Sequence, residues 1–356
     1  MTSRRRFLVL AGTVLALCVT TGTQLVTPAA SLPARLSDQE FWRLVTESSE
    51  ADGYFRSDNL LSNELGYQHV IPELMRRATP GRVYMGVGPE QNFAYIAALR
   101  PAMVFIVDVR RGNLDLHLMY KALFELSADR AEFVSRLFAK KRPDGLTVKS
   151  TVADIFGAFA AVPASSLLFA ENLKAIDTLL ARKHGLALSK DDVEGIRYVY
   201  NAFYSFGQRI QYSSTSSFGG SFQPDYAELM TASDLKGVAR GYLATEDHFK
   251  FMKDLESRNL LVPVVGNFGG PKAIRAVGRY LKERNATVSA FYLSNVEQYH
   301  RQEGSCENFC ANVATLPLDN TSTFIRSVRR PGGSAPGFGL ASELGGMMTD
   351  VQSCRP

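Results

Sequence analysis

Two neighbouring segments of the chain share one pattern: RVYMGVGPEQNF at residues 82–93 and MVFIVDVRRGN at residues 103–113. Each begins with a short apolar run without polar alternation, which is typical of a strand buried on both faces of a parallel sheet. Each run ends in a turn, and a helical pattern follows. Pro89 suits the first turn of such a helix, where its missing N–H is tolerated. The order strand, helix, strand, helix predicts an α/β fold.

The same rhythm returns after a long helical region. Further strands are expected at residues 260–265, 287–293 and 323–328, and Pro263 favours an edge strand or a bulge. Between the two α/β parts, residues 127–256 show apolar side chains at three- and four-residue spacing, which indicates helices. The sequence therefore predicts a doubly wound, mostly parallel Rossmann-like sheet with a largely helical insertion.

The N-terminus matches the twin-arginine export pattern. SRRRFL at residues 3–8 has a serine, two arginines, any residue and then Phe-Leu. The apolar stretch at residues 7–19 is shorter than the about 20 residues of a membrane span and fits a signal-peptide core. We expect residues 1–30 to be a signal peptide for the twin-arginine export machinery, and the mature protein to be periplasmic or secreted and not membrane-spanning. The alternative is an uncleaved N-terminal membrane anchor.

The remaining chain is long enough for one large domain with its own core. A single α/β domain is expected over residues 31–330, and the glycine-rich residues 331–356 are expected to form a flexible tail. Once a signal peptide is removed, Cys306, Cys310 and Cys354 remain. One disulfide with one thiol left over is then permitted, and the spacing leaves the pairing open.

Composition and motifs argue against several classes of function. The net charge is +5, and three of these charges come from Arg4, Arg5 and Arg6, so the remainder gives no electrostatic case for nucleic-acid binding. The histidines are scattered without metal-ligand spacing, so no metal site is expected. The sequence has neither a Gly-x-Ser-x-Gly elbow nor a phosphate-binding Gly-Lys-Ser/Thr loop, which disfavours hydrolases and nucleotidases.

Polar loops follow the expected strands at the edge where open α/β sheets bind ligands. They are residues 86–92, 108–113, 266–270 and 294–295. Glycines allow the backbone to approach a ligand closely, and the first turn of a helix offers free N–H groups. Asp108 lies 22 residues after Gly86, which suits an acidic residue that accepts hydrogen bonds from two ribose hydroxyls. We therefore expect a small-molecule ligand at this edge.

At these residues the sequence resembles the class I S-adenosylmethionine-dependent methyltransferase fold. It is similar, more closely, to a family of uncharacterised bacterial proteins that share VGPEQNF at residues 87–93 and D-x-RR-x-N at residues 108–113. The resemblance implies that the chain binds S-adenosylmethionine or a related adenosine-containing ligand. The cofactor-binding residues that it implies are Gly86, Gly88, Glu90, Gln91, Asn92, Asp108 and Asn295.

The same resemblance implies catalytic positions. Asn267 would lie beside the transferred methyl group, and Asn63 and Glu64 would orient the methyl acceptor together with Asn295. The sequence departs from the usual pattern at Glu90, which occupies the third glycine position of the turn. A carboxylate there would suit an ammonium group and repel a diphosphate.

Two functions stay open from sequence. The first is a methyltransferase-like enzyme, in which positioning of the acceptor drives the transfer. The second is a non-catalytic binding or structural module that keeps the scaffold without turnover. Export is the main objection to the first, because S-adenosylmethionine is made and used in the cytoplasm.

Overall fold

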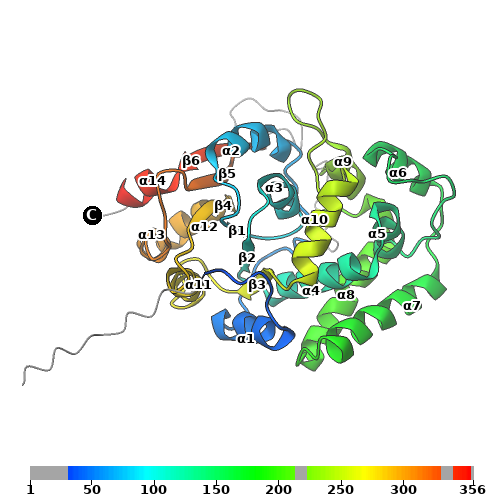
Figure 1. The fold of residues 1–356 in the computed structure, drawn as a ribbon, viewed down its shortest axis with the longest axis horizontal. Helices are drawn as coiled ribbons and strands as arrows, with labels where there is room; N and C mark the ends of the chain where they lie inside the picture. Colours follow the sequence, from blue (N-terminus) through cyan, green and yellow to red (C-terminus); the bar gives the residue numbers. More distant parts are fainter. Residues whose placement is uncertain (1–30, 213–222, 330–339, 354–356) are drawn as a thin grey trace, which may run out of the picture.

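A six-stranded sheet organises the protein (Figure 1). The structure is a computed structural model that describes residues 31–212, 223–329 and 340–353. Residues 1–30, which hold the predicted signal peptide, lie outside these ranges, as does Cys354.

The strand order in the sheet is β3-β2-β1-β4-β5-β6, and every pair is parallel except β5 with β6. The strands are β1 (Val83–Gly86), β2 (Met103–Asp108), β3 (Leu261–Val265), β4 (Val288–Ser294), β5 (Thr323–Arg329) and β6 (Leu340–Gly346). The first three are buried along their whole length, which explains why the sequence shows no polar alternation there. Strand order reverses between β1 and β4. The α/β class with a mostly parallel sheet is therefore confirmed, and it is compatible with a Rossmann-like fold.

Helices cover both faces of the sheet, as Figure 1 shows. One face carries α3 (Gln91–Leu99), α4 (Arg111–Leu126) and α10 (Glu246–Ser257). The other carries α1 (Asp38–Ser48), α11 (Ala273–Lys282), α12 (Val296–Glu303) and α13 (Cys306–Val313). The short helices η1 (Tyr67–Val70) and α2 (Ile71–Arg77) precede β1. This double layer leaves the carboxyl edge of the strands for the loops.

The predicted helical insertion forms an outer layer against α4 (Figure 1). Its elements are α5 (Arg130–Leu137), α6 (Val152–Ala160), α7 (Ser166–Asp177), η2 (Thr178–Lys183), α8 (Lys190–Phe206), η3 (Gly207–Arg209) and α9 (Tyr226–Thr231). Buried aromatic rings join this layer to the sheet. The ring of Phe133 on α5 lies 4.7 Å from that of Phe124 on α4, and the ring of Tyr120 on α4 lies 5.2 Å from that of Phe93 on α3, measured between centroids. Such aromatic contacts stabilise the junction between insertion and sheet.

Part of the predicted flexible tail belongs to the sheet, and this corrects the sequence-based expectation. Residues 340–346 form β6, antiparallel to β5, and α14 (Met347–Ser353) follows. Backbone hydrogen bonds form a strand ladder whatever the side chains, so a glycine-rich sequence can still pair. Gly345 leaves room for the Arg326 guanidinium, which pairs with Asp350 at 2.7 Å and with Glu297 on α12 at 2.6 Å.

Candidate binding cavity at the strand ends

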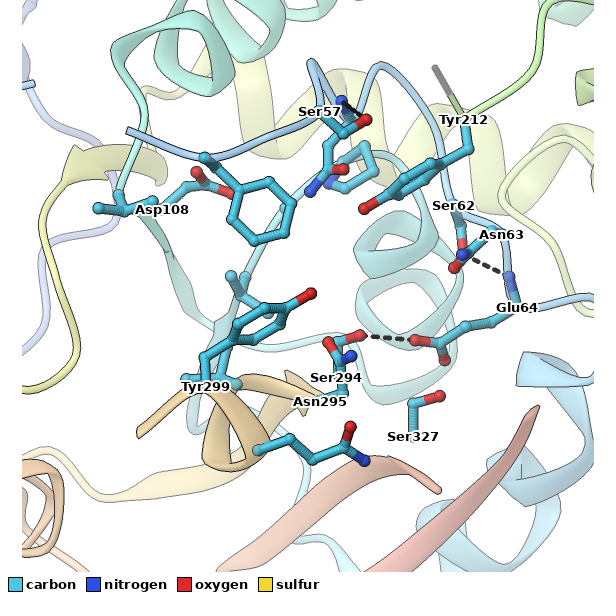
Figure 2. A pocket seen from close by; sticks show the side chains of 18 of the residues that line it. Ser57, Ser62, Asn63, Glu64, Asp108, Tyr212, Ser294, Asn295, Tyr299 and Ser327 are labelled. Carbon is cyan, nitrogen blue, oxygen red and sulfur yellow. Dashed lines mark hydrogen bonds between the residues drawn. The ribbon is translucent and has the colours of Figure 1, made fainter. Parts of the chain in front are cut away.

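A cavity of about 540 Å³ lies at the carboxyl edge of the sheet (Figure 2). Gly88 after β1, Asp108 at the end of β2, Ser294 at the end of β4 and Ser327 on β5 all line it. The cavity therefore spans the point between β1 and β4 where strand order reverses, which is the usual ligand position in open α/β sheets. Its volume is within the range of small-molecule sites.

Residues 49–64, called the strap here, cross this edge before the chain enters the sheet. The strap contacts one strand end after another: the N–H of Glu50 donates to the carbonyl of Val265 at 2.7 Å, and that of Gly53 to Val109 at 2.8 Å. Further along, the N–H of Ser62 donates to the carboxylate of Glu90 at 3.3 Å. Many strap residues line the cavity, so a segment outside the α/β core forms one wall of the site.

The carboxylate of Glu50 fixes the first part of the strap to the β3–α11 loop. It accepts the N–H groups of Asn267 at 3.1 Å, Lys272 at 2.8 Å and Ala273 at 2.9 Å. A side chain at Gly270 would meet this carboxylate, because its Cβ would lie 2.4 Å from an oxygen of Glu50. The loop at residues 266–270, which was expected to approach a ligand, thus binds the carboxylate of Glu50 instead. The N-terminus of α11 favours a negative charge at this position.

Gly88 and Asp108 lie together in the cavity, as the sequence predicted. Gly88 has φ +74°, a left-handed conformation that glycine adopts without steric cost. A Cβ placed on Gly88 would lie 4.0 Å from Oδ2 of Asp108. Asp108 also pairs with Arg110, whose Nε donates to Oδ1 at 3.1 Å and whose second terminal nitrogen donates to Oδ2 at 3.2 Å. Since a carboxylate oxygen accepts two hydrogen bonds, Oδ2 keeps acceptor capacity for a ligand.

Gly86 and Asn92, both expected to bind the cofactor, lie behind the turn and do not line the cavity. The side-chain amide of Asn92 donates to the carbonyls of Val87 at 2.9 Å and Pro89 at 2.8 Å, so it holds the turn in shape. Gly86 makes room for it, because a Cβ there would lie 1.8 Å from the Asn92 oxygen. Both residues support the turn from inside the fold.

Glu90 and Gln91 also point away from the cavity. Glu90 is 1% exposed, and burial raises the pKa of its carboxyl to about 8. The sequence-based argument that Glu90 attracts an ammonium and repels a diphosphate therefore fails, because this carboxyl does not reach the ligand space. Gln91 hydrogen-bonds with Ser62 and donates to Glu64 at 3.0 Å. The two residues anchor the second half of the strap to α3.

Glu64 lies in the cavity opposite Asp108, as Figure 2 shows. One of its oxygens accepts the hydroxyl protons of Tyr292 and Ser294, each at 2.7 Å. Ser294 has φ +49°, and the β4–β5 register shifts between residues 292 and 294. A non-glycine residue in this left-handed region carries a steric cost, and such strain gathers at functional sites. The end of β4 is thus distorted where Ser294 meets Glu64.

The remaining predicted residues are three half-buried asparagines, one of which is held in a turn. Asn63 and Asn295 line the cavity, and no hydrogen bond of either side chain to another described residue is found. Asn267 lines it too, although its side-chain oxygen accepts the N–H of Gly269 at 2.8 Å. Ser294 belongs to the polar loop at residues 294–295 that was expected at this edge, but no role in binding was expected for it.

Aromatic side chains form a wall that the sequence did not reveal. The rings of Phe55 in the strap and Tyr299 on α12 meet edge to face, with centroids 5.3 Å apart. Tyr212 also lines the cavity, and burial raises the pKa of its hydroxyl to about 12. Tyr212 and Tyr299 both project into the space between Asp108 and Glu64 (Figure 2). These residues come from three distant segments, so no local motif marks them.

The part of the chain that the structure describes shows whether side chains gather to bind a metal ion and which state its cysteines are in. Within it, no cluster of three or more His, Cys, Asp or Glu side chains is arranged to hold a metal ion. Cys310 is in a disulfide and Cys306 is a free thiol, so these two do not pair with each other. Over the same residues, no helix has the length and apolar character needed to cross a membrane.

A family described as "Domain of unknown function (DUF7790)" matches residues 60–342. The chain belongs to this family. The DUF7790 match begins inside the strap and ends in β6, so it contains β1 to β5 and the helical insertion. No curated protein matches the chain.

Proposed function

We propose that the cavity binds an adenosine-containing ligand, with S-adenosylmethionine as the first candidate, on a methyltransferase-like scaffold. The observation that carries the proposal is the close approach of the Gly88 backbone to the Asp108 carboxylate inside one cavity. A carboxylate at the end of the second strand suits the two hydroxyls of a ribose, and a glycine turn lets the ligand approach the backbone.

The aromatic wall supports the same ligand class. An adenine ring stacks favourably on aromatic side chains, at about 1–3 kcal/mol per base. Phe55, Tyr212 and Tyr299 supply such rings within the cavity that also holds Asp108. At the end of the cavity opposite Asp108, polar groups that include Glu64 and Asn295 then face the substituent that extends from the nucleoside.

The catalytic form of the proposal is methyl transfer, for which S-adenosylmethionine supplies an activated methyl group. The protein would contribute positioning, because a correctly held acceptor reacts faster without a strong base. The amides of Asn63 and Asn295 are available to hydrogen-bond an acceptor, whereas Asn267 is held by its own turn. The alternative is a module that binds the ligand without turnover.

Calorimetric titration with S-adenosylmethionine and S-adenosylhomocysteine tests the proposal. Asp108→Asn keeps the side-chain size but removes the charge, so we expect binding to weaken about 10- to 100-fold, the range for a hydrogen bond to a charged group. Asp191→Asn, at an exposed position on α8, is the matched control and should bind like the parent. No binding by the parent protein rules the proposal out, and equal binding by Asp108→Asn rules out this site.

We also propose export through the twin-arginine route, followed by a periplasmic or secreted location. The support is the SRRRFL pattern at residues 3–8 and the short apolar stretch after it. Replacing Arg4 and Arg5 by lysine keeps the charge and breaks the pattern, so the protein should stay in the cytoplasm. Fractionation that finds this variant exported as efficiently as the parent refutes the route.

A further inference from the structure

Glu64 is a buried acidic side chain inside the cavity, and it has no charged partner in the part of the chain that the structure describes. It is 2% exposed, and its hydrogen-bond donors are neutral: the hydroxyls of Tyr292 and Ser294 and the amide of Gln91. No Lys, Arg or His among the described residues lies within ion-pair distance of it. A buried carboxylate is ordinarily paired, because removing a charge from water is costly.

Asp108, a second buried acidic residue that lines the cavity, differs in this respect. Asp108 is neutralised by Arg110, with the guanidinium forked onto both carboxylate oxygens. Glu90 is nearby in sequence but does not line the cavity. Burial raises the pKa of the Tyr292 hydroxyl, and the nearby charge of Glu64 raises it further. Asp108 is therefore paired with a cation, whereas Glu64 has no cation within ion-pair distance among the described residues.

Glu64 also keeps room for one more donor. The oxygen that accepts from Tyr292 and Ser294 has both lone pairs in use, whereas the oxygen that accepts from Gln91 has one in use. Ser294 donates its proton to Glu64, which leaves the serine oxygen able to accept from a ligand. The carboxylate oxygen of Glu64 and the hydroxyl oxygen of Ser294 thus suit a cationic centre, as hydrogen-bond acceptors for an ammonium or through charge attraction for a sulfonium.

We propose that Glu64 binds a positively charged centre of the ligand, an ammonium or a sulfonium, and selects charged adenosine compounds over neutral ones. This inference rests on the proposed function, since it assumes that the nucleoside lies toward Asp108. The competing explanation is structural: Glu64 ties the strap to β4 and has no part in selectivity. If Glu64 binds the cation, removing its charge alone lowers the selectivity for charged ligands. If its role is structural, the selectivity stays the same.

Three ligands separate the sources of charge. 5′-Methylthioadenosine carries no charge, S-adenosylhomocysteine carries an ammonium and a carboxylate, and S-adenosylmethionine has the same two groups and a sulfonium as well. We expect the affinity of the parent protein to rise along this series, by about 10- to 100-fold overall. Glu64→Gln, which keeps the size of the side chain, should flatten the rise while leaving 5′-methylthioadenosine affinity unchanged. A step lost between the first two ligands assigns the ammonium, and a step lost between the last two assigns the sulfonium.

Glu171→Gln is the control, because it makes the same substitution at an exposed position on α7. Urea unfolding of each variant checks that the fold is intact. Two outcomes overturn the inference and leave the proposed function standing. In the first, the parent binds all three ligands with equal affinity. In the second, Glu64→Gln shows the same rise in affinity along the series as the parent. Failure of the parent to bind any of the three overturns the proposed function itself.

Discussion

Glu90 gives a sharp test of the packing behind the cavity. Its carboxyl lies near four buried tyrosines from separate elements, Tyr67, Tyr120, Tyr226 and Tyr242, and its charge contributes to raising the pKa of each. One carboxyl oxygen accepts the N–H of Ser62, and the other has no hydrogen-bond partner among the described residues. Burial therefore raises the pKa of Glu90 from 4.5 to about 8.

The direction of the pH effect follows from proton linkage. Between pH 4.5 and about 8 the folded chain keeps a proton on Glu90 that the unfolded chain has released, so unfolding releases a proton. Rising pH then favours unfolding, by about 1.4 kcal/mol for each pH unit. The contribution of Glu90 to stability is fully present below pH 4.5 and is lost as the pH rises toward 8. Over the whole window the loss is about 5 kcal/mol.

Glu90→Gln resembles the protonated side chain at every pH and should remove this slope. Urea unfolding of parent and variant at pH 5.5 to 8.5 should show the variant gaining stability relative to the parent by about 1.4 kcal/mol per pH unit until about pH 8. Asp115 and Glu256 also have pKa values raised by burial to about 8, so only the difference between the two proteins isolates Glu90. Parallel profiles for parent and variant would show that Glu90 is ionised in the fold and refute the reasoning.

Two further substitutions test the cavity and the strap. Gly88→Ala places a side chain on a backbone in the left-handed conformation beside Asp108, so it should lower the free energy of unfolding by about 1–2 kcal/mol and weaken ligand binding. Thermal unfolding and ligand titration measure the two effects. An unchanged melting temperature contradicts the assigned conformation. Glu50→Ala removes the carboxylate that accepts three backbone N–H groups of the β3–α11 loop, so it should cost about 1–3 kcal/mol in urea unfolding. Amide exchange should then quicken in the strap and the start of α11, and unchanged exchange there contradicts the anchoring role.

The turn after β1 shows how far sequence reasoning reached. VGPEQNF at residues 87–93 correctly marked a strand end, which lies at the cavity, and Asp108 was correctly placed beside Gly88. Neighbours of the glycine were assigned by the same logic, yet Gly86 and Glu90 face the interior. Side chains one or two positions apart in a turn point in different directions, and that direction depends on packing that a motif does not encode.

The sequence by itself determined the apolar strands, their alternation with helices, the edge position of Pro263 and the helical character of residues 127–256. These features follow from local periodicity and from the missing N–H of proline. Only the tertiary structure decided that the strap crosses the strand ends, that Arg110 pairs with Asp108, and that Glu64 has no counter-ion within the described ranges. Those contacts join segments far apart in the chain, so each depends on where the whole fold brings its partners.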